Sequence, residues 1–295
     1  MLQYRTNKWA IILFLLPTLL VYSLFEVVPI VQTFYFSLYD WNGIQGVRMK
    51  FVGLANFTDL FAYKGFDIAM KNVARYIVLS LLTQIPIGFA MAIVLYRFNK
   101  GFRFFKAAFF SPLVLSYTAV GLMWYFIFYP NDGVLNRFLE AIGLSSWTRN
   151  WLIDPDTALN SVIFVTTWAS VGIYMTLAYA AITAIPEPVL EAGMLDGATG
   201  WKRVRYLILP MIFETTKISV ILVITGILKT FEIIFVLTEG GPNGLTNVPV
   251  SLMYYEAFKY DNYGLGSAIG IVVFVLSILL TVISLRMMRS EKLEY

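Results

Sequence analysis

Long apolar segments, separated by short charged loops, dominate the chain. Six of them are long enough to cross about 30 Å of hydrocarbon at about 1.5 Å per residue. They cover residues 9–36, 73–96, 104–129, 158–185, 206–228 and 265–285. Most are apolar on all sides, which is typical of helices surrounded by lipid and other helices. The pattern therefore predicts an all-α, polytopic membrane protein with about six transmembrane helices.

Composition supports lipid as the solvent of these segments. Of the 295 residues, 59% are hydrophobic and 14% are charged, whereas a soluble domain carries about 25% charged residues. No tandem repeat or flexible linker divides the chain, so we expect a single transmembrane domain over residues 1–295. The first apolar segment exceeds the roughly 7–15 residues of a signal-peptide core and shows no obvious cleavage site. We therefore expect it to be retained as the first membrane helix.

The positions of Lys and Arg predict the orientation of the chain. Basic residues gather after the second segment, in RFNKGFRFFK, after the fourth, in WKRVR, and near both termini. The loop at residues 131–157 carries acids as well as bases. Because loops rich in Lys and Arg stay cytoplasmic, we expect both termini and the loop after the fourth segment on that side. The net charge of +4 is modest and does not favour nucleic acid as a partner.

The residue types that the chain lacks limit its chemistry. It has no Cys and no His, so thiol nucleophiles, Ser-His triads and the usual zinc sites lose their essential side chains. No G-x-x-x-x-G-K-[ST] loop is present to bind nucleotide phosphates. We therefore expect no catalytic residue and no metal site in this chain. A membrane-embedded enzyme would need a cluster of catalytic side chains within the bilayer, and none is evident in the sequence.

A charged loop with several glycines joins the fourth and fifth segments, at about residues 187–210. Pro188 suits the first turn of a short helix, and Gly197 and Gly200 permit a sharp bend with positive φ. Residues 201–209 can then form a second short helix. By periodicity alone, such a helix–turn–helix docks into a groove of a protein partner or rests on the bilayer surface, with about equal weight.

The same loop resembles the EAA loop of permease subunits in binding-protein-dependent ABC importers. That pattern is EAA, three residues, G, nine residues and I-x-LP. The chain keeps every spacing, with Glu191-Ala192-Gly193, then Gly197, then Leu207-Ile208-Leu209-Pro210. Two positions differ from the pattern, since Gly193 stands for the second Ala and Leu207 for the Ile. Neither difference removes the charge or the bend.

Further stretches extend the resemblance over nearly the whole chain. FVGLANFTDLF, YPNDGVLN and WLIDPDTALNS follow in the order that sugar-type permeases show. The stretch LTEGGPNGLT at residues 237–246 is similar to the LTxGGPxxxT signature of the maltose-type first permease subunit. Its TEGGPN segment predicts a tight turn on the outer surface. Gly240, Gly241 and Pro242 would there contact the binding protein, or equally pack against the partner permease.

The resemblance implies a MetI-like permease fold with cytoplasmic coupling helices, in a bacterial or archaeal plasma membrane. It implies four kinds of partner: a second permease subunit, two ATP-binding cassette subunits, an extracellular solute-binding protein and a sugar ligand, besides membrane lipid. ATP and Mg²⁺ would belong to the ATPase subunits, so this chain would not be an enzyme. The loop residues that would couple it to an ATPase are Glu191, Ala192, Gly193, Asp196, Gly197 and Pro210.

A few polar residues inside the apolar segments are candidates for the solute pathway. Sugar sites need aromatic faces and short hydrogen-bonding groups. By resemblance, Thr166, Ser170 and Thr230 match the family's ligand-lining positions in place but not in residue type, and Tyr174 is close to Thr166 and Ser170 in the sequence. The alternative, that these hydroxyls only join helices to one another, has at least equal weight.

Together these features predict the transmembrane subunit of an ATP-driven importer for a sugar or oligosaccharide. The alternatives are a secondary transporter, which tends to show internal repeats and midplane charges, and a permease for another solute, such as a glycerol phosphate derivative. Two charged residues, Glu214 and Lys217, lie three positions apart. We expect them to form an ion pair at the membrane interface rather than a transport site.

Overall fold

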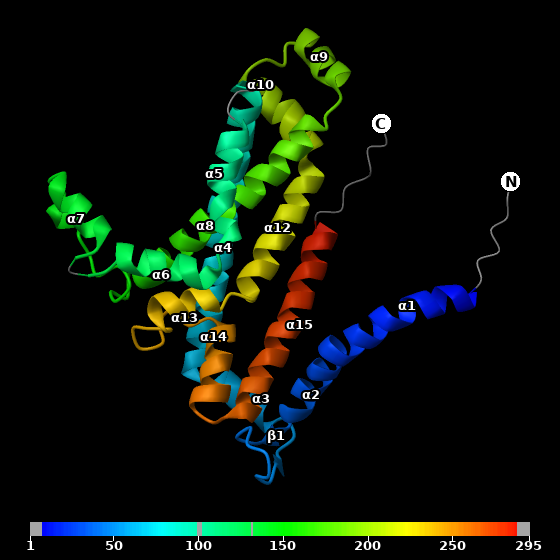
Figure 1. Cartoon of the computed structure of the whole chain (residues 1–295), viewed down its shortest axis with the longest axis vertical. Helices are drawn as coiled ribbons and strands as arrows, with labels where there is room; N and C mark the ends of the chain where they lie inside the picture. The colour runs from blue at the N-terminus through cyan, green and yellow to red at the C-terminus, as the bar shows by residue number, and fades with distance from the viewer. Residues whose placement is uncertain (1–7, 99–101, 131, 288–295) are drawn as a thin grey trace. The chain divides into compact units, whose positions relative to one another are not determined.

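The computed structural model describes residues 8–98, 102–130 and 132–287, and Figure 1 shows most of this part as helix. The chain forms two compact units. The smaller consists of Met1–Tyr63 and Met253–Val272, and the larger of Lys64–Leu252 and Val273–Tyr295. One boundary between them lies between Tyr63 and Lys64, and the other two fall within α14 (Pro249–Tyr254) and α15 (Tyr263–Met287).

The smaller unit combines helices with one short hairpin. Its elements are α1 (Lys8–Tyr22), η1 (Ser23–Val27), α2 (Val28–Phe36), β1 (Tyr39–Asp40), β2 (Lys50–Phe51), α3 (Ala55–Ala62), η4 (Tyr255–Lys259) and the start of α15. β1 and β2 pair antiparallel, with Tyr39 opposite Phe51. The buried Asn56 of the FVGLANF stretch donates hydrogen bonds to the carbonyls of Ser37 and Tyr39, at 2.8 and 2.9 Å. Since buried carbonyl groups need such partners, Asn56 fixes the chain where α2 leads into β1.

The larger unit is built from helices. They are α4 (Lys64–Phe98), α5 (Phe102–Val114), α6 (Tyr117–Ile127), α7 (Val134–Ala141), η2 (Ser145–Trp147), α8 (Ala158–Thr183), α9 (Glu187–Leu195), α10 (Trp201–Arg203), η3 (Val204–Ile208), α11 (Leu209–Met211), α12 (Phe213–Leu228) and α13 (Glu232–Thr238), with parts of α14 and α15. α8 is the central element of this unit, because it contacts α4, α5, α6, α12 and α13.

Close backbone contact holds α8 against its neighbours. A Cβ atom on Gly172 would lie 2.0 Å from the carbonyl oxygen of Phe109 in α5, and one on Gly88 of α4 would lie 2.8 Å from the amide nitrogen of Met175. Small residues allow membrane helices to approach in this way. The buried residues Val162, Met175 and Ile182 then fill the space between the helices.

The predicted all-α membrane fold is confirmed, and two of its segments are bent. Four stretches are continuous helices long and apolar enough to cross a membrane: Ile11–Phe36, Lys64–Arg97, Ala158–Thr183 and Tyr263–Met287. The predicted segments at 104–129 and 206–228 are each part of a bent pair instead. Arg103–Val114 and Tyr117–Ile127 meet at 99°, and Trp201–Met211 and Phe213–Leu228 at 69°. The described residues contain up to six spans when each pair counts as one.

Local sequence explains the first bend. Pro112 lies in the last turn of α5, where its ring removes a backbone donor. Ser116 has an extended backbone and starts α6 by accepting a hydrogen bond from the amide of Ala119 at 3.2 Å. A serine N-cap of this kind favours a new helix in a new direction. In Figure 1, α5 and α6 accordingly run along different directions.

Candidate coupling segment and solute cavity

The structure confirms the predicted helix–turn–helix after α8. We call residues 187–210 the coupling segment. Its first helix is α9, and Gly197 and Gly200 have φ values of +79° and +55° in the turn that follows. The backbone of Ala198 closes α9 by donating to the carbonyl of Gly193 at 2.8 Å. A second helical run from Trp201 to Met211 comprises α10, the single π-helical turn η3, and α11.

α9 presents acids and apolar side chains together. Leu190 is its one buried residue, whereas Glu191, Ala192 and Asp196 are exposed. Leu195 is 90% exposed, so its side chain makes almost no contact within this chain. An exposed short helix with both kinds of side chain suits docking into a protein groove.

The two positions that differ from the EAA pattern contact each other. A Cβ atom on Gly193 would lie 2.9 Å from Cδ2 of Leu207, closer than the roughly 3.5–4.0 Å of favourable carbon contacts. Leu207 therefore occupies the space that the methyl group of an alanine at 193 would need. The pair joins α9 to η3, so the two differences compensate each other.

Gly193→Ala is expected to leave stability nearly unchanged in the wild type and to raise it in the Leu207→Ile background. In the wild type, the gain in helix propensity of about 0.5–1 kcal/mol is offset by overlap with Leu207. In Leu207→Ile, the side chain has a different shape and the gain is recovered. Thermal unfolding of the four purified variants measures the coupling between the sites. Strictly additive changes in melting temperature would contradict the compensation.

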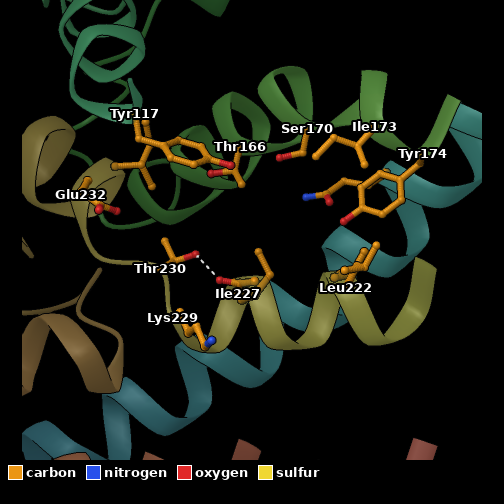
Figure 2. Close-up of a pocket in the computed structure, with 14 residues that line it drawn as sticks. Tyr117, Thr166, Ser170, Ile173, Tyr174, Leu222, Ile227, Lys229, Thr230 and Glu232 are labelled. Atoms are coloured by element: carbon orange, nitrogen blue, oxygen red, sulfur yellow. Dashed lines mark hydrogen bonds between the residues drawn. The ribbon is translucent and has the colours of Figure 1, made fainter. Parts of the chain in front are cut away.

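A cavity of about 380 Å³ lies between α4, α6, α8, α12 and α13. Figure 2 shows Thr166, Ser170 and Tyr174 of α8 along one wall, with Leu222 and Ile227 of α12 and Thr230 on the other. All four residues predicted for the solute pathway thus line one cavity. Their roles in transport stay a prediction.

Hydrogen bonds orient two of these hydroxyl groups. Thr166 donates to the carbonyl of Val162 at 3.1 Å and also contacts the hydroxyl of the buried Tyr76. Thr230 donates to the carbonyl of Gly226 at 3.1 Å, the contact drawn in Figure 2 beside Ile227. Both hydroxyl oxygens keep acceptor capacity toward the cavity.

Sequence reasoning missed several residues of the cavity, of which Gln84 is the most informative. Its side chain is 1% exposed and lines the cavity, and its Nε2 atom has no partner among the described residues. Buried amides are normally satisfied, so this donor indicates a ligand position. The signal was available, since Gln84 is an isolated amide within a predicted membrane helix. Tyr117, Lys229 and Glu232 also line the cavity, but only the tertiary structure reveals this.

The helices α8 and α12, which precede and follow the coupling segment in the sequence, also line the cavity. α8 contributes residues 166–174 and ends at Thr183, so that Ala184, Ile185 and Pro186 alone separate it from α9. α12 contributes residues 222–227 and begins directly after Ile212, where the second helical run bends by 69°. The segment is thus connected in sequence to both walls.

The predicted tight turn after α13 is confirmed. Gly240 has φ +77°, and its carbonyl accepts a hydrogen bond from the amide of Thr246 at 3.2 Å. The Thr246 hydroxyl donates to the carbonyl of Gly241 at 2.7 Å. Asn72 of α4 anchors the end of the turn by donating to the carbonyls of Leu245 and Asn247, both at 2.8 Å.

The charged residues of the segments have ordinary local partners. Glu214 and Lys217 form the expected ion pair at 2.7 Å. Arg75 donates from Nη2 to Asn160 Oδ1 at 3.0 Å, which joins α4 to α8. Within the described ranges, no three His, Cys, Asp or Glu side chains gather to hold a metal ion.

Comparison with solved structures gives the same fold. A chain of a bacterial alginate ABC transporter, solved in complex with an alginate pentasaccharide-bound periplasmic protein, has a similar fold. The structural match covers 96% of this chain and 94% of that chain. The TM-score is 0.83 and the sequence identity is 24%. At this identity the likeness concerns the fold.

Comparison with known sequences identifies the family. The chain is 36% identical over 290 residues to the probable ABC transporter permease protein YurN of Bacillus subtilis, covering 98% of this chain and 99% of that protein. It is 29% identical to the trehalose/maltose transport system permease protein MalF of Thermococcus litoralis, over 99% and 97% of the two chains. Residues 84–290 match the family described as binding-protein-dependent transport system inner membrane component. The chain is therefore a member of this family of ABC transporter permeases.

Proposed function

We propose that the chain forms part of the membrane pathway of an ATP-driven importer for a sugar or oligosaccharide. One observation carries the proposal: the helices α8 and α12, which line the cavity, also enclose the exposed coupling segment. A push on that segment can open or close the cavity. The proposed unit of function is the whole chain, residues 1–295.

The chemistry of the cavity supports a sugar. Thr166, Ser170 and Thr230 supply hydroxyl groups, Gln84 supplies an amide, and Tyr174 supplies an aromatic ring. Sugar hydroxyls are recognised by such short polar groups and by apolar ring faces. Relatives are named for starch degradation products in Thermoanaerobacterium thermosulfurigenes and for diacetylchitobiose in Streptomyces coelicolor. Lys229 at the cavity favours a second class of solute, a glycerol phosphate derivative.

The coupling segment is proposed to dock into a separate ATPase subunit, which binds ATP and Mg²⁺. α9 would enter a groove of that subunit, with Leu195 as the apolar anchor and Glu191 paired to a basic residue. Ala192, Gly193, Asp196 and Gly197 would shape the docked helix and its turn, while Pro210 lies beside the bend into α12. The ATPase side is the cytoplasm, and both termini lie there.

The remaining partners are a second permease subunit and an extracellular solute-binding protein. The turn at Gly240, Gly241 and Pro242 belongs to the opposite, outer side of the membrane. It is proposed to contact the binding protein or the second permease. The membrane is the plasma membrane of a bacterium or archaeon, since the named relatives come from such organisms.

Reconstitution tests the proposal. The chain, its second permease and the ATPase subunits are placed in liposomes with the binding protein, and uptake is measured against a panel of sugars, uronides and glycerol phosphate. We expect uptake that requires ATP and one class of the panel. Solute movement by the purified chain without ATP would instead identify a secondary transporter.

Gln84→Leu is expected to slow uptake at solute concentrations below saturation by about three- to tenfold, because one hydrogen bond to the solute is lost. The same change removes an unsatisfied buried amide, so the melting temperature should stay equal or rise. Ser80→Ala is the matched control, since Ser80 lies one turn earlier on α4, is fully buried and lines no part of the cavity. Uptake and thermal unfolding are measured on both. Unchanged uptake in Gln84→Leu would remove Gln84 from the pathway.

A further inference from the structure

A second cavity, of about 700 Å³, lies beside the coupling segment. One side is formed by the ends of α4 and α8, at residues 93–97 and 179–183. The other side is formed by Gly200 to Ile208, the second helix of the coupling segment. Neither the solute pathway nor the proposed contact of α9 with the ATPase uses this cavity.

The charged groups of this cavity are all basic. Arg97 and Arg203 line it, and none of its described lining residues is acidic. Arg203 is partly buried, and its Nε atom is enclosed without a partner among the described residues. Its Nη1 atom reaches only the sulfur of Met194, at 4.0 Å. A guanidinium group in this position suits an anion, whose oxygens its donors fit.

Aliphatic side chains form part of the remaining wall. Ile93 and Val94 lie on α4, with Val94 52% exposed, and Val204 and Ile208 face the cavity from η3. The cavity also lies where the membrane-spanning stretches Lys64–Arg97 and Ala158–Thr183 end, which is where the headgroup layer of a bilayer is expected. A fitting ligand therefore has an anionic head and an apolar tail.

We propose that this cavity binds an anionic phospholipid, with its phosphate on Arg97 and Arg203 and an acyl chain along Ile93 and Val94. Basic pockets between membrane helices at the cytoplasmic surface bind such headgroups. Trp201, which is 69% exposed and lines the cavity, suits the same headgroup layer. The bound lipid would pack against the second helix of the coupling segment on the side that faces the cavity. This inference does not depend on the identity of the solute.

The test uses the full-length chain, purified in detergent and mixed with phosphatidylglycerol or phosphatidylcholine. Native mass spectrometry counts retained lipids, and thermal unfolding measures stabilisation. We expect preferential retention of phosphatidylglycerol, and about tenfold weaker binding in Arg203→Gln and in Arg97→Gln, since each loses charge-assisted hydrogen bonds. Arg205→Gln is the matched control, because Arg205 lies in the same helix, stacks over Tyr206 and does not line the cavity.

Several results would overturn the proposal. Equal retention of the two lipids would show that the cavity does not distinguish an anionic headgroup from a zwitterionic one. Wild-type binding by both glutamine variants would show that the two arginines do not bind the headgroup. Stabilisation by inorganic phosphate alone, equal to that by the lipid, assigns the cavity to a soluble anion. Complete release of the lipid on assembly with the ATPase subunits assigns it to a protein contact. Arg97 is exposed, so Arg97→Gln decides the matter if Arg203→Gln fails to fold.

Discussion

Glu191→Lys is expected to reduce ATP-driven uptake at least about tenfold, while the permease still assembles with its partners. Reversing one charge of a hydrogen-bonded interfacial pair costs about 2–5 kcal/mol. Because Glu191 is exposed on α9, the fold of this chain should be unaffected. Uptake and solute-stimulated ATP hydrolysis in proteoliposomes measure the effect, and co-purification of the two permeases reports assembly.

Glu187→Lys is the control for this experiment. Glu187 lies one turn earlier on the same helix and is also exposed. Its replacement should cost only the roughly 0.3–1 kcal/mol of an unfavourable charge in a first helical turn, and uptake should stay within about twofold of the wild type. Uptake at the wild-type rate in Glu191→Lys would refute the role of Glu191. Equal losses in both variants would indicate a general effect of charge on α9.

Gly172→Leu is expected to prevent normal packing of α8 against α5. Even the first added carbon would lie 2.0 Å from the carbonyl oxygen of Phe109 and 2.7 Å from its carbonyl carbon. Both are backbone atoms, so the two helices must separate. Overpacking of this kind costs about 1–3 kcal/mol or more. We expect little folded protein in membranes and a melting temperature several degrees below that of the wild type.

Gly226→Ala is the matched control for packing. Gly226 lies in α12, and no atom of a neighbouring element is within 4 Å of the position of its Cβ. The alanine should therefore leave the free energy of unfolding unchanged or raise it by up to about 0.5–1 kcal/mol, the difference in helix propensity. The melting temperature should stay equal or rise accordingly. Normal yield and stability of Gly172→Leu would contradict the close contact between α5 and α8.

The sequence predicted the helical class because lipid imposes a simple rule on apolar length. It also predicted the coupling segment, since Pro188, Gly197 and Gly200 are local signals whose effects do not depend on distant contacts. The bends at residues 115–116 and 212 were not predicted. Pro112 and Pro210 mark their neighbourhoods, but proline is tolerated within straight membrane helices, so the angle depends on packing.

The residues of the solute cavity also divide into those that the sequence indicates and those that only the packing of the helices reveals. Thr166, Ser170, Tyr174 and Thr230 stood out by resemblance and by polarity within apolar segments. Gln84 shares that polarity, but it is neither ionisable nor part of a motif that carries the resemblance. Leu222, Val223 and similar wall residues look like ordinary lipid-facing side chains in the sequence. Which of them face inward depends on how α4, α8 and α12 meet.

The arrangement of α8 and α12 around the coupling segment has a thermodynamic consequence. If an ATPase bound at α9 changes the affinity of the cavity for its solute, the solute must change the affinity for the ATPase by the same factor. A permease with solute in its cavity should then bind the ATPase with a different affinity from an empty one. Reciprocity of this kind would let the arrival of solute change how tightly the ATPase is bound, without a dedicated sensor.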